Sequence, residues 1–170
     1  VAQTLDAVVI VVVNAAQTEA VLFGEAGIAG QLVPGTAVLA CATVGPDVAR
    51  DLGRRCAALG LHYLDAPVSG GTIKAADGTL SILASGCPEA FAKARPALDA
   101  MAAQVFELGD EVGAGSSMKA VNQMLVGIQI ASMAEAMTFG MTQGVEPAKF
   151  LEIISQCAGT SWALESRAPH

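Results

Sequence analysis

Lys119 is the residue in this sequence whose surroundings most favour chemistry. It lies in an apolar stretch that begins at Gly113, and no other Lys or Arg occurs between Arg95 and Lys149. Burial disfavours the charged form of a lysine and lowers its pKa, so that the amine can exchange protons near neutral pH. The competing interpretation is a lysine whose stem lies on apolar surface while its ammonium group reaches water. For a lysine taken alone, that second interpretation is the more common one.

Asn122 shifts the balance toward chemistry at Lys119. The two residues are three positions apart, so they share one face of a predicted helix, and an amide beside an amine can hold a substrate hydroxyl. Taken alone, Asn122 is explained equally well by a hydrogen bond near a helix end. The same face continues through apolar residues that predict a core stripe, namely Val126, Ile130, Met133 and Met137.

A second polar stretch, Ser69-Gly70-Gly71, follows a predicted strand. Its glycines leave successive backbone N–H groups unobstructed and Ser69 adds a hydroxyl, which together can cradle a carboxylate or a phosphate. An ordinary turn after the strand is the competing interpretation, and spacing alone slightly favours it. Asp65 lies four residues before Ser69, where we expect it either to position this loop or only to cap it.

The elements around these residues follow the pattern of an α/β protein. Strand-like and helix-like segments alternate along the first part of the chain, with strands at 7–13, 36–42 and 62–66 and helices at 17–30 and 46–59. This alternation predicts βαβ units and a parallel sheet. Ligands bind at the carboxyl ends of the strands in such sheets, and Val13, Asn14 and Thr43 lie there as well.

The second part of the chain changes from alternating elements to helices. The expected elements are strands at 79–84 and 105–108, helices at 88–101, 116–140 and 147–157, and an irregular tail at 158–170. The composition shifts near residues 109 to 115. We therefore expect a domain boundary between residues 112 and 113.

Composition and charge exclude several classes of function. The net charge of −7 argues against a nucleic-acid partner, which needs clustered basic residues. No basic amphipathic helix or signal peptide is recognisable, and the apolar run at 7–13 is too short to span a bilayer. The four cysteines are widely spaced without a Cys-x-x-Cys pair, so we expect reduced thiols, no metal site and a cytoplasmic location.

Two motifs together resemble the β-hydroxyacid dehydrogenase family, which includes enzymes of the 3-hydroxyisobutyrate dehydrogenase type. They are Asp65-Ala-Pro-Val-Ser-Gly-Gly71 and Gly113-x-Gly-x-x-x-Lys119-x-x-Asn122, in the order and at about the separation that the family shows. The segments 12–17 and 161–170 most resemble the branch that acts on L-threonate, a four-carbon sugar acid. The joint match is more specific than either motif alone.

The resemblance implies a fold and a cofactor. Residues 1–112 would be the C-terminal part of a Rossmann-type domain that binds NAD or NADP, and residues 113–170 the start of an all-α domain on a long connecting helix. The protein would be a homo-oligomer, either a dimer or a tetramer, and would act on a small hydroxy acid.

The resemblance also implies roles for the residues of the two motifs. Lys119 would be the general base or acid on the substrate hydroxyl, and Asn122 would orient that hydroxyl or fix the lysine. The loop of Ser69, Gly70 and Gly71 would hold the substrate carboxylate. The residues that would line the nicotinamide side are Val13, Asn14 and Thr43.

The sequence also departs from the family pattern. It contains no Gly-x-Gly-x-x-Gly loop for the cofactor pyrophosphate and no first strands with the residue that selects NAD or NADP. Most of the C-terminal helical domain, with a second lysine, is absent too. The chain starts at Val1 without a methionine, and we expect a piece of a longer protein. Two alternatives follow: a structural piece that binds no cofactor by itself, or a catalytically silent family member, against which Lys119 argues.

Overall fold

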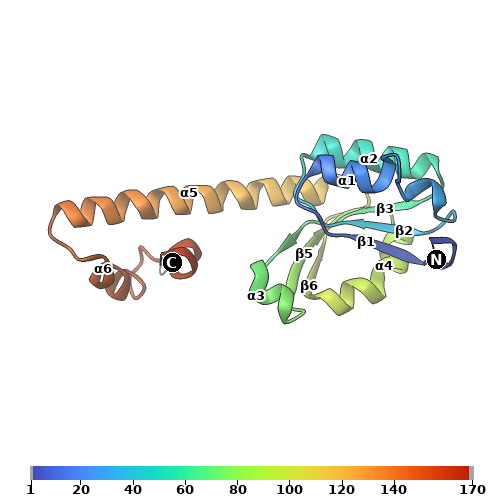
Figure 1. Ribbon diagram of the computed structural model, residues 1–170. Helices are drawn as coiled ribbons and strands as arrows, with labels where there is room; N and C mark the ends of the chain where they lie inside the picture. Colours follow the sequence, from blue (N-terminus) through green and yellow to red (C-terminus); the bar gives the residue numbers. More distant parts are fainter. Residues whose placement is uncertain (1, 169–170) are drawn as a thin grey trace. The chain divides into compact units, whose positions relative to one another are not determined.

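The computed structural model describes residues 2–168, which form two compact units, 2–120 and 121–168 (Figure 1). The elements of the first unit, besides the 3-10 turns Ala2–Thr4 and Ala29–Gln31, are β1 (Ala7–Ile10), α1 (Ala15–Phe23), β2 (Ala37–Ala40), α2 (Pro46–Ala58), β3 (His62–Asp65), β4 (Val68–Ser69), α3 (Gly71–Ala76), β5 (Leu80–Ala84), α4 (Pro88–Met101) and β6 (Ala102–Glu107). Helix α5 (Ala114–Thr142) begins in the first unit and continues into the second, which also contains α6 (Pro147–Ile154) and α7 (Trp162–Arg167).

Strands β1, β2 and β3 form a parallel sheet in that order, which confirms the predicted βαβ units. Val8 pairs with Val38, and Val38 pairs with Tyr63. Every residue of the central strand β2 is buried. A parallel strand covered on both faces needs such a continuous apolar sequence.

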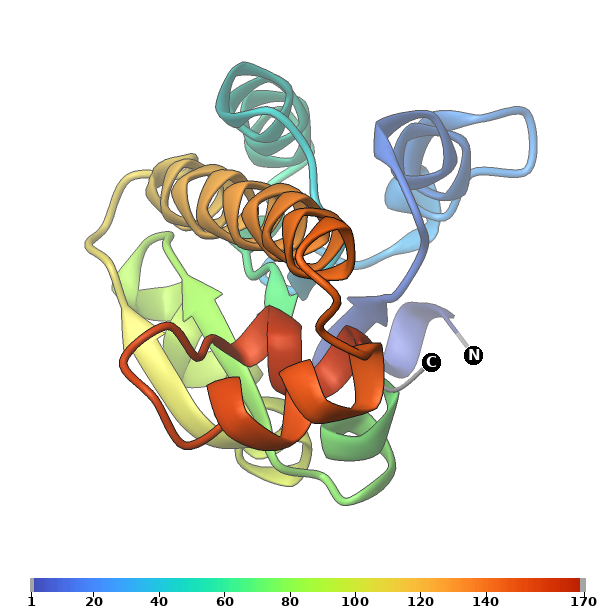
Figure 2. The same cartoon turned by 90° about the vertical axis from the view of Figure 1, so that its left-hand side faces the viewer.

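Helices cover both faces of this sheet. Helices α1 and α2 lie on one face and α4 lies on the other (Figures 1 and 2). Leu22 and Leu52 pack from α1 and α2 against one face, and Leu98 packs from α4 against the other. Each fully buried leucine contributes about 1.5–3 kcal/mol of transfer free energy, so these two cores fix the sheet that carries the candidate residues.

A second sheet, β4-β5-β6, continues from the first. Strand β4 is antiparallel to β5, and β5 is parallel to β6. The two sheets meet where the N–H of Asp65 donates to the carbonyl of Ser85 at 3.0 Å and the N–H of Ser85 donates back at 2.9 Å. Strand β4 and helix α3 were not predicted, because two strand residues and a six-residue helix are too short to show a periodic pattern.

The predicted first strand ends earlier than expected. It stops at Ile10 instead of continuing to residue 13, and the side chains of Val11 and Val13 are 72% and 79% exposed. The cause is a capped helix start directly after them: the Asn14 side chain accepts a hydrogen bond from the N–H of Gln17 at 3.0 Å. The apolar run therefore contains a strand and a surface loop.

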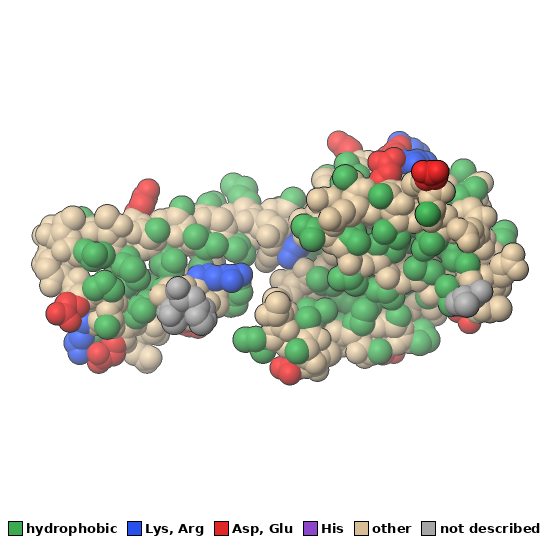
Figure 3. Space-filling model, in the orientation of Figure 1, with side chains coloured by type: hydrophobic (Ala, Val, Ile, Leu, Met, Phe, Trp, Pro, Cys, Tyr) green, Lys and Arg blue, Asp and Glu red, His purple; other side chains and the backbone are tan. Residues whose placement is uncertain are grey.

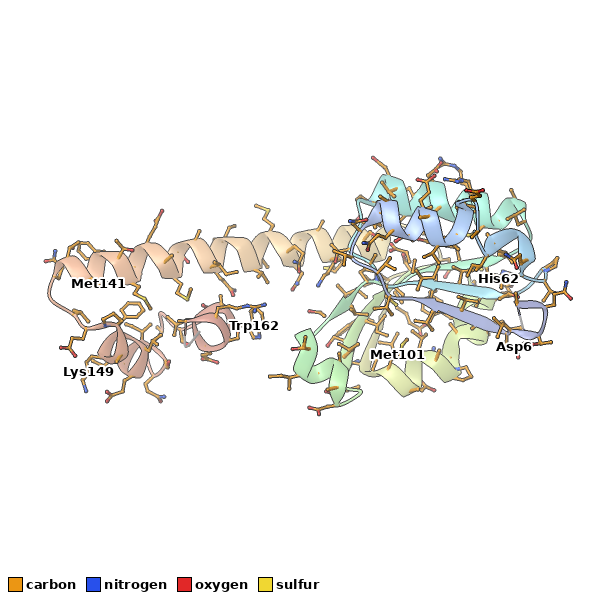
Figure 4. The ribbon with its side chains drawn as sticks, viewed as in Figure 1. Asp6, His62, Met101, Met141, Lys149 and Trp162 are labelled. Carbon is orange, nitrogen blue, oxygen red and sulfur yellow. The ribbon has the colours of Figure 1, made fainter. Side chains whose placement is uncertain are left out.

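The tail that was predicted to be irregular, residues 158–170, contains a helix. Helix α7 occupies residues 162 to 167, and the Ser161 hydroxyl accepts a hydrogen bond from the N–H of Leu164 at 3.2 Å as its N-cap. Trp162 opens this helix half-exposed, with the Arg167 guanidinium 5.6 Å from its ring centre (Figure 4). A serine cap before a six-residue helix is a weak sequence signal. Residues 169 and 170 of the predicted tail lie outside the described residues.

The stripe predicted as core on α5 is only partly buried. Val126, Met133 and Met137 are half-buried, and Ile130 is 39% exposed. Hydrophobic side chains cover more than one side of this helix (Figure 3). By length and hydropathy α5 could cross a membrane, and it is the single helix among residues 2–168 of which this is true.

The predicted domain boundary lies close to the start of α5, whereas the division into compact units falls inside that helix, after Ala120. The first turns of α5 belong to the first unit because they pack on the sheet. The boundary at residues 112 and 113 stays a prediction.

Candidate active site

Lys119 lies on the second turn of α5 with 7% of its surface exposed. Within residues 2–168 its ammonium group has no hydrogen-bond or ion-pair partner. Burial lowers the pKa of Lys119 because the charged form loses hydration. The side chain is thus mostly buried while its nitrogen keeps some access to solvent, and the lowered pKa favours the neutral amine, the form that can accept a proton.

The start of α5 is held by Asp65, the last residue of β3. Its Oδ2 accepts hydrogen bonds from the N–H groups of Gly113 at 3.1 Å and Ser116 at 2.8 Å, and its Oδ1 accepts one from the Ser116 hydroxyl at 2.7 Å. Burial raises the pKa of Asp65, and the hydrogen bonds from Ser116 and Gly113 oppose that rise. Asp65 was expected to position or cap the Ser69 loop, but its carboxylate binds the start of α5.

Gly115 brings α5 into direct contact with the sheet. A Cβ atom at this position would lie 2.4 Å from the carbonyl oxygen of Leu83 and 2.8 Å from that of Asp65. Real Cβ atoms do not approach backbone oxygens so closely, so the position requires glycine. The N–H of Gly115 also donates to the Ser85 hydroxyl at 3.0 Å. This close approach explains the second glycine of the Gly113-x-Gly motif.

The loop Ser69-Gly70-Gly71 connects β4 to α3. Gly70 has φ of 135° and Gly71 has φ of 69°, both in the region that favours glycine. The Ser69 hydroxyl is partly exposed and has no partner among residues 2–168. The loop therefore offers a free hydroxyl on a backbone conformation that other residues would strain, and its role as a carboxylate cradle stays a prediction.

The cofactor-side residues follow the carboxyl ends of two adjacent strands. Val13 and Thr43 each lie three residues beyond the paired positions Ile10 and Ala40. The Thr43 side chain is exposed, and its hydroxyl has no partner in the described part of the chain. Asn14 differs from both, because its side chain is engaged as the N-cap of α1. The role of these three residues on the nicotinamide side stays a prediction.

Asn122 lies one turn beyond Lys119 on α5 and is partly exposed. Its side-chain amide donates to the Oε1 of Gln123 at 3.2 Å. No contact of the Asn122 side chain with Lys119 is among the hydrogen bonds of the described residues. The role of Asn122 stays a prediction.

Two family models match the chain. The model of the NAD binding domain of 6-phosphogluconate dehydrogenase matches residues 1–109, and the model of the NAD-binding domain of NADP-dependent 3-hydroxyisobutyrate dehydrogenase matches residues 113–170. The chain belongs to the β-hydroxyacid dehydrogenase family. The resemblance inferred from the two motifs is thereby confirmed, and the cofactor of the family is NAD or NADP.

The most similar relatives include two L-threonate dehydrogenases. That of Cupriavidus necator is 50% identical over 165 residues, covering 97% of this chain and 56% of that protein. That of Haemophilus influenzae is 46% identical over 169 residues, covering 99% of this chain and 56% of that protein. The chain spans about half the length of the curated relatives it matches.

A solved structure shares the fold. The crystal structure of a 3-hydroxyisobutyrate dehydrogenase from Salmonella typhimurium is 42% identical, with a TM-score of 0.94 over 99% of this chain and 59% of that chain. The likeness covers α5, so an apolar helix at this place is a feature of the β-hydroxyacid dehydrogenase fold. Its length and hydropathy are therefore no argument for a membrane span.

Three residues that hold the start of α5 were given no such role from the sequence. Ser85 and Ser116 are buried polar residues, and Gly115 is the point of closest approach. An acidic residue at a strand end and a serine at a helix start are a usable signal for such capping. The sequence alone did not connect them, because 51 positions separate Asp65 from Ser116.

We predict that replacing Lys119 with methionine stabilises the protein in a pH-dependent way. Between the lowered pKa of the folded state and about 10.4, the ordinary lysine value, the unfolded chain binds a proton that the folded chain does not. The contribution of Lys119 to the free energy of unfolding therefore rises with pH in that window. The gain in free energy of unfolding of Lys119→Met over the wild type is largest at neutral pH and shrinks as the pH rises.

Urea denaturation of wild type and Lys119→Met from neutral pH to about 10 measures this difference. Lys74→Met, at an exposed position on α3, is the control and is expected to differ little from wild type throughout. A stability difference for Lys119→Met that stays constant over the range would contradict the prediction.

Proposed function

We propose that this chain provides the substrate side of an NAD- or NADP-dependent oxidoreductase that acts on a small 3-hydroxy acid. The observation that carries the proposal is Lys119, a side chain that is 7% exposed and has no partner among residues 2–168, on a helix fixed to the ends of the sheet strands. The cofactor supplies the hydride chemistry at its nicotinamide ring. The residues of this chain bind the substrate, orient it and move its proton.

Each site residue has a proposed part in oxidation of the substrate. Lys119 Nζ accepts the hydroxyl proton while the hydride leaves the carbon that bears the hydroxyl, and it returns a proton in the reverse direction. The loop of Ser69, Gly70 and Gly71 holds the substrate carboxylate. Asn122 orients the hydroxyl or fixes the lysine. Val13, Asn14 and Thr43 would line the nicotinamide side of the site.

We propose an L-threonate-like four-carbon acid as the substrate. The support is the similarity to two proteins named L-threonate dehydrogenase. The runner-up substrates are 3-hydroxyisobutyrate, because a neighbour of the same fold carries that name, and tartronate semialdehyde with its product glycerate. All are small carboxylates that carry a hydroxyl or carbonyl group on which the Lys119 amine could act.

We propose that the domain boundary lies between residues 112 and 113. One family model matches residues 1–109 and the other begins at residue 113 and matches to residue 170.

We also propose a cytoplasmic location, because none of the four cysteines is paired. Burial raises the pKa of Cys41 and Cys56 to about 12, which keeps these two thiols protonated and unreactive.

We predict that Lys119→Ala in the natural protein containing this chain lowers kcat by about 10²–10⁴-fold, the usual contribution of a general acid or base. Substrate KM and the fold change little, since the amine acts on the proton in transit. Steady-state turnover with L-threonate, 3-hydroxyisobutyrate and glycerate measures this loss and ranks the substrates. Near-normal turnover of the variant would remove Lys119 from the mechanism, and a preference for 3-hydroxyisobutyrate would replace the proposed substrate.

The alternative function, a structural piece that binds no cofactor by itself, is tested on the chain alone. We predict that the 170-residue chain shows no measurable affinity for NAD, because it contains no Gly-x-Gly-x-x-Gly loop to bind the pyrophosphate. Calorimetric titration with NAD and NADP measures this directly. Micromolar binding would show that the strand ends at Val13 and Thr43 suffice to bind the cofactor without the glycine loop.

We propose further that the protein is a homo-oligomer, a dimer or tetramer, with α5 at the contact. Val121, Leu125 and Ile128 follow one another at coiled-coil spacing and are each more than half exposed. The stripe carries no charge, so two copies can pair along it without burying an unpaired charge.

We predict that the double substitution Leu125→Glu and Ile128→Glu reduces the natural protein to monomers, because it places like charges across the contact. Light scattering after size-exclusion chromatography measures the mass. Gln123→Glu adds charge on another side of α5 and is the control that should remain oligomeric. A monomeric wild type would refute the oligomer, and an oligomeric double variant would refute this contact.

A further inference from the structure

Asp65 lies where three parts of the candidate site meet. It is 1% exposed at the end of β3, and its backbone exchanges two hydrogen bonds with Ser85 at the end of β5. The N–H of the next residue, Ala66, donates to the carbonyl of Ala40 in β2 at 3.0 Å. The backbone around Asp65 is therefore fixed by strands on both sides.

The side chain of Asp65 replaces the hydrogen bonds that the start of α5 cannot make by itself. The first helical bond of α5 runs from the N–H of Ser117 to the carbonyl of Gly113 at 2.9 Å. The N–H groups before it have no partner within the helix. Asp65 accepts those of Gly113 and Ser116, and the Ser85 hydroxyl accepts that of Gly115. A carboxylate is also the favourable charge at the positive end of a helix.

Each functional segment is only a few residues from Asp65 itself or from a residue that Asp65 binds. Lys119 is three positions beyond Ser116, less than one helical turn. In the other direction Ser69 is four positions beyond Asp65, across the fully buried Ala66 and Pro67. The carbonyl of Pro67 accepts from the N–H of Leu83 at 3.0 Å. One connection is thus helical, and the other passes through buried residues and a strand hydrogen bond.

We propose that Asp65 is a positioning residue that sets where the Lys119 amine lies relative to the Ser69-Gly70-Gly71 loop. The inference rests on the proposed function, in which that loop holds the substrate carboxylate and Lys119 moves the hydroxyl proton. The distance between a carboxylate and the reacting hydroxyl of a substrate is fixed by its bonds. Asp65 holds the protein groups at a matching separation by joining both segments to one rigid point.

Two substitutions separate hydrogen bonding from charge at Asp65. Asp65→Ala removes every bond to α5. Asp65→Asn can keep them, because its Oδ1 can accept from the N–H groups of Gly113 and Ser116 while its amide donates to the Ser116 hydroxyl. If position is the role, the asparagine variant rescues most of the activity that alanine loses.

In the natural protein we expect Asp65→Ala to lower kcat by about 10²-fold, the cost of misplacing a reacting group by about 1 Å, with cofactor KM unchanged. Ser116→Ala, which removes one of the three bonds, gives a smaller loss and remains informative if Asp65→Ala does not fold. Leu98→Ala is the control, since it opens a core cavity on α4 away from these contacts and should keep kcat per folded molecule.

A double-variant cycle decides whether Asp65 acts through the lysine. In a Lys119→Met background, Asp65→Ala should cause no further loss of kcat. Hydrogen exchange in the 170-residue chain provides a readout without activity, since Asp65→Ala should accelerate exchange at Ser116 and Ser117 while Leu98→Ala should not.

The outcomes distinguish the two proposals. Normal turnover of Lys119→Met would refute the proposed function. Loss of turnover in Lys119→Met together with normal kcat in both Asp65→Ala and Ser116→Ala would refute the positioning role alone. Multiplicative losses in the double variant would also refute it, because Asp65 would then act independently of Lys119.

Discussion

The capping of α5 by the carboxylate of Asp65 is the interaction on which the candidate site depends. A helix that starts against the ends of sheet strands leaves N–H groups without partners, and leaving them buried costs about 1–3 kcal/mol each. Asp65 and Ser85 accept these groups at distances of 2.8 to 3.1 Å. Gly115 is equally necessary for these hydrogen bonds, because any larger residue would push the helix away from the acceptors.

The burial of Lys119 follows from this arrangement. With α5 drawn against the sheet, the second turn lies close enough to the first unit to leave the lysine 7% exposed and unpartnered. Desolvation lowers the pKa of Lys119 in the folded state, which costs stability at neutral pH and raises the fraction of the neutral amine that can accept a proton. Proteins retain such costs where the group is needed for chemistry. A structural lysine at this position would gain from a partner that the described residues do not provide.

The sequence predicted the sheet and the motifs better than it predicted the connections between them. Strand β2 and helix α4 carry strong patterns, an apolar run and a proline start, and both were expected near their observed positions. The antiparallel β4 and the short helix α7 carry too few residues for a periodic signal. The hydrogen bonds from Ser116 to Asp65 could not be predicted, because they join segments far apart in the sequence whose pairing depends on the finished fold. Exposure on α5 was misjudged for a similar reason, since an apolar sequence does not say what covers it.

Almost the entire proposed substrate geometry lies within one compact unit. The Ser69 loop, Thr43 and Lys119 all belong to Val1–Ala120, and the contacts that fix them come from β3, β5 and the first turn of α5. Asn122 is the exception, because it lies beyond Ala120. The contacts that hold Lys119 and the Ser69 loop thus lie within the first unit. The proton-transfer geometry that we propose would then be set by the sheet and by the carboxylate at its edge.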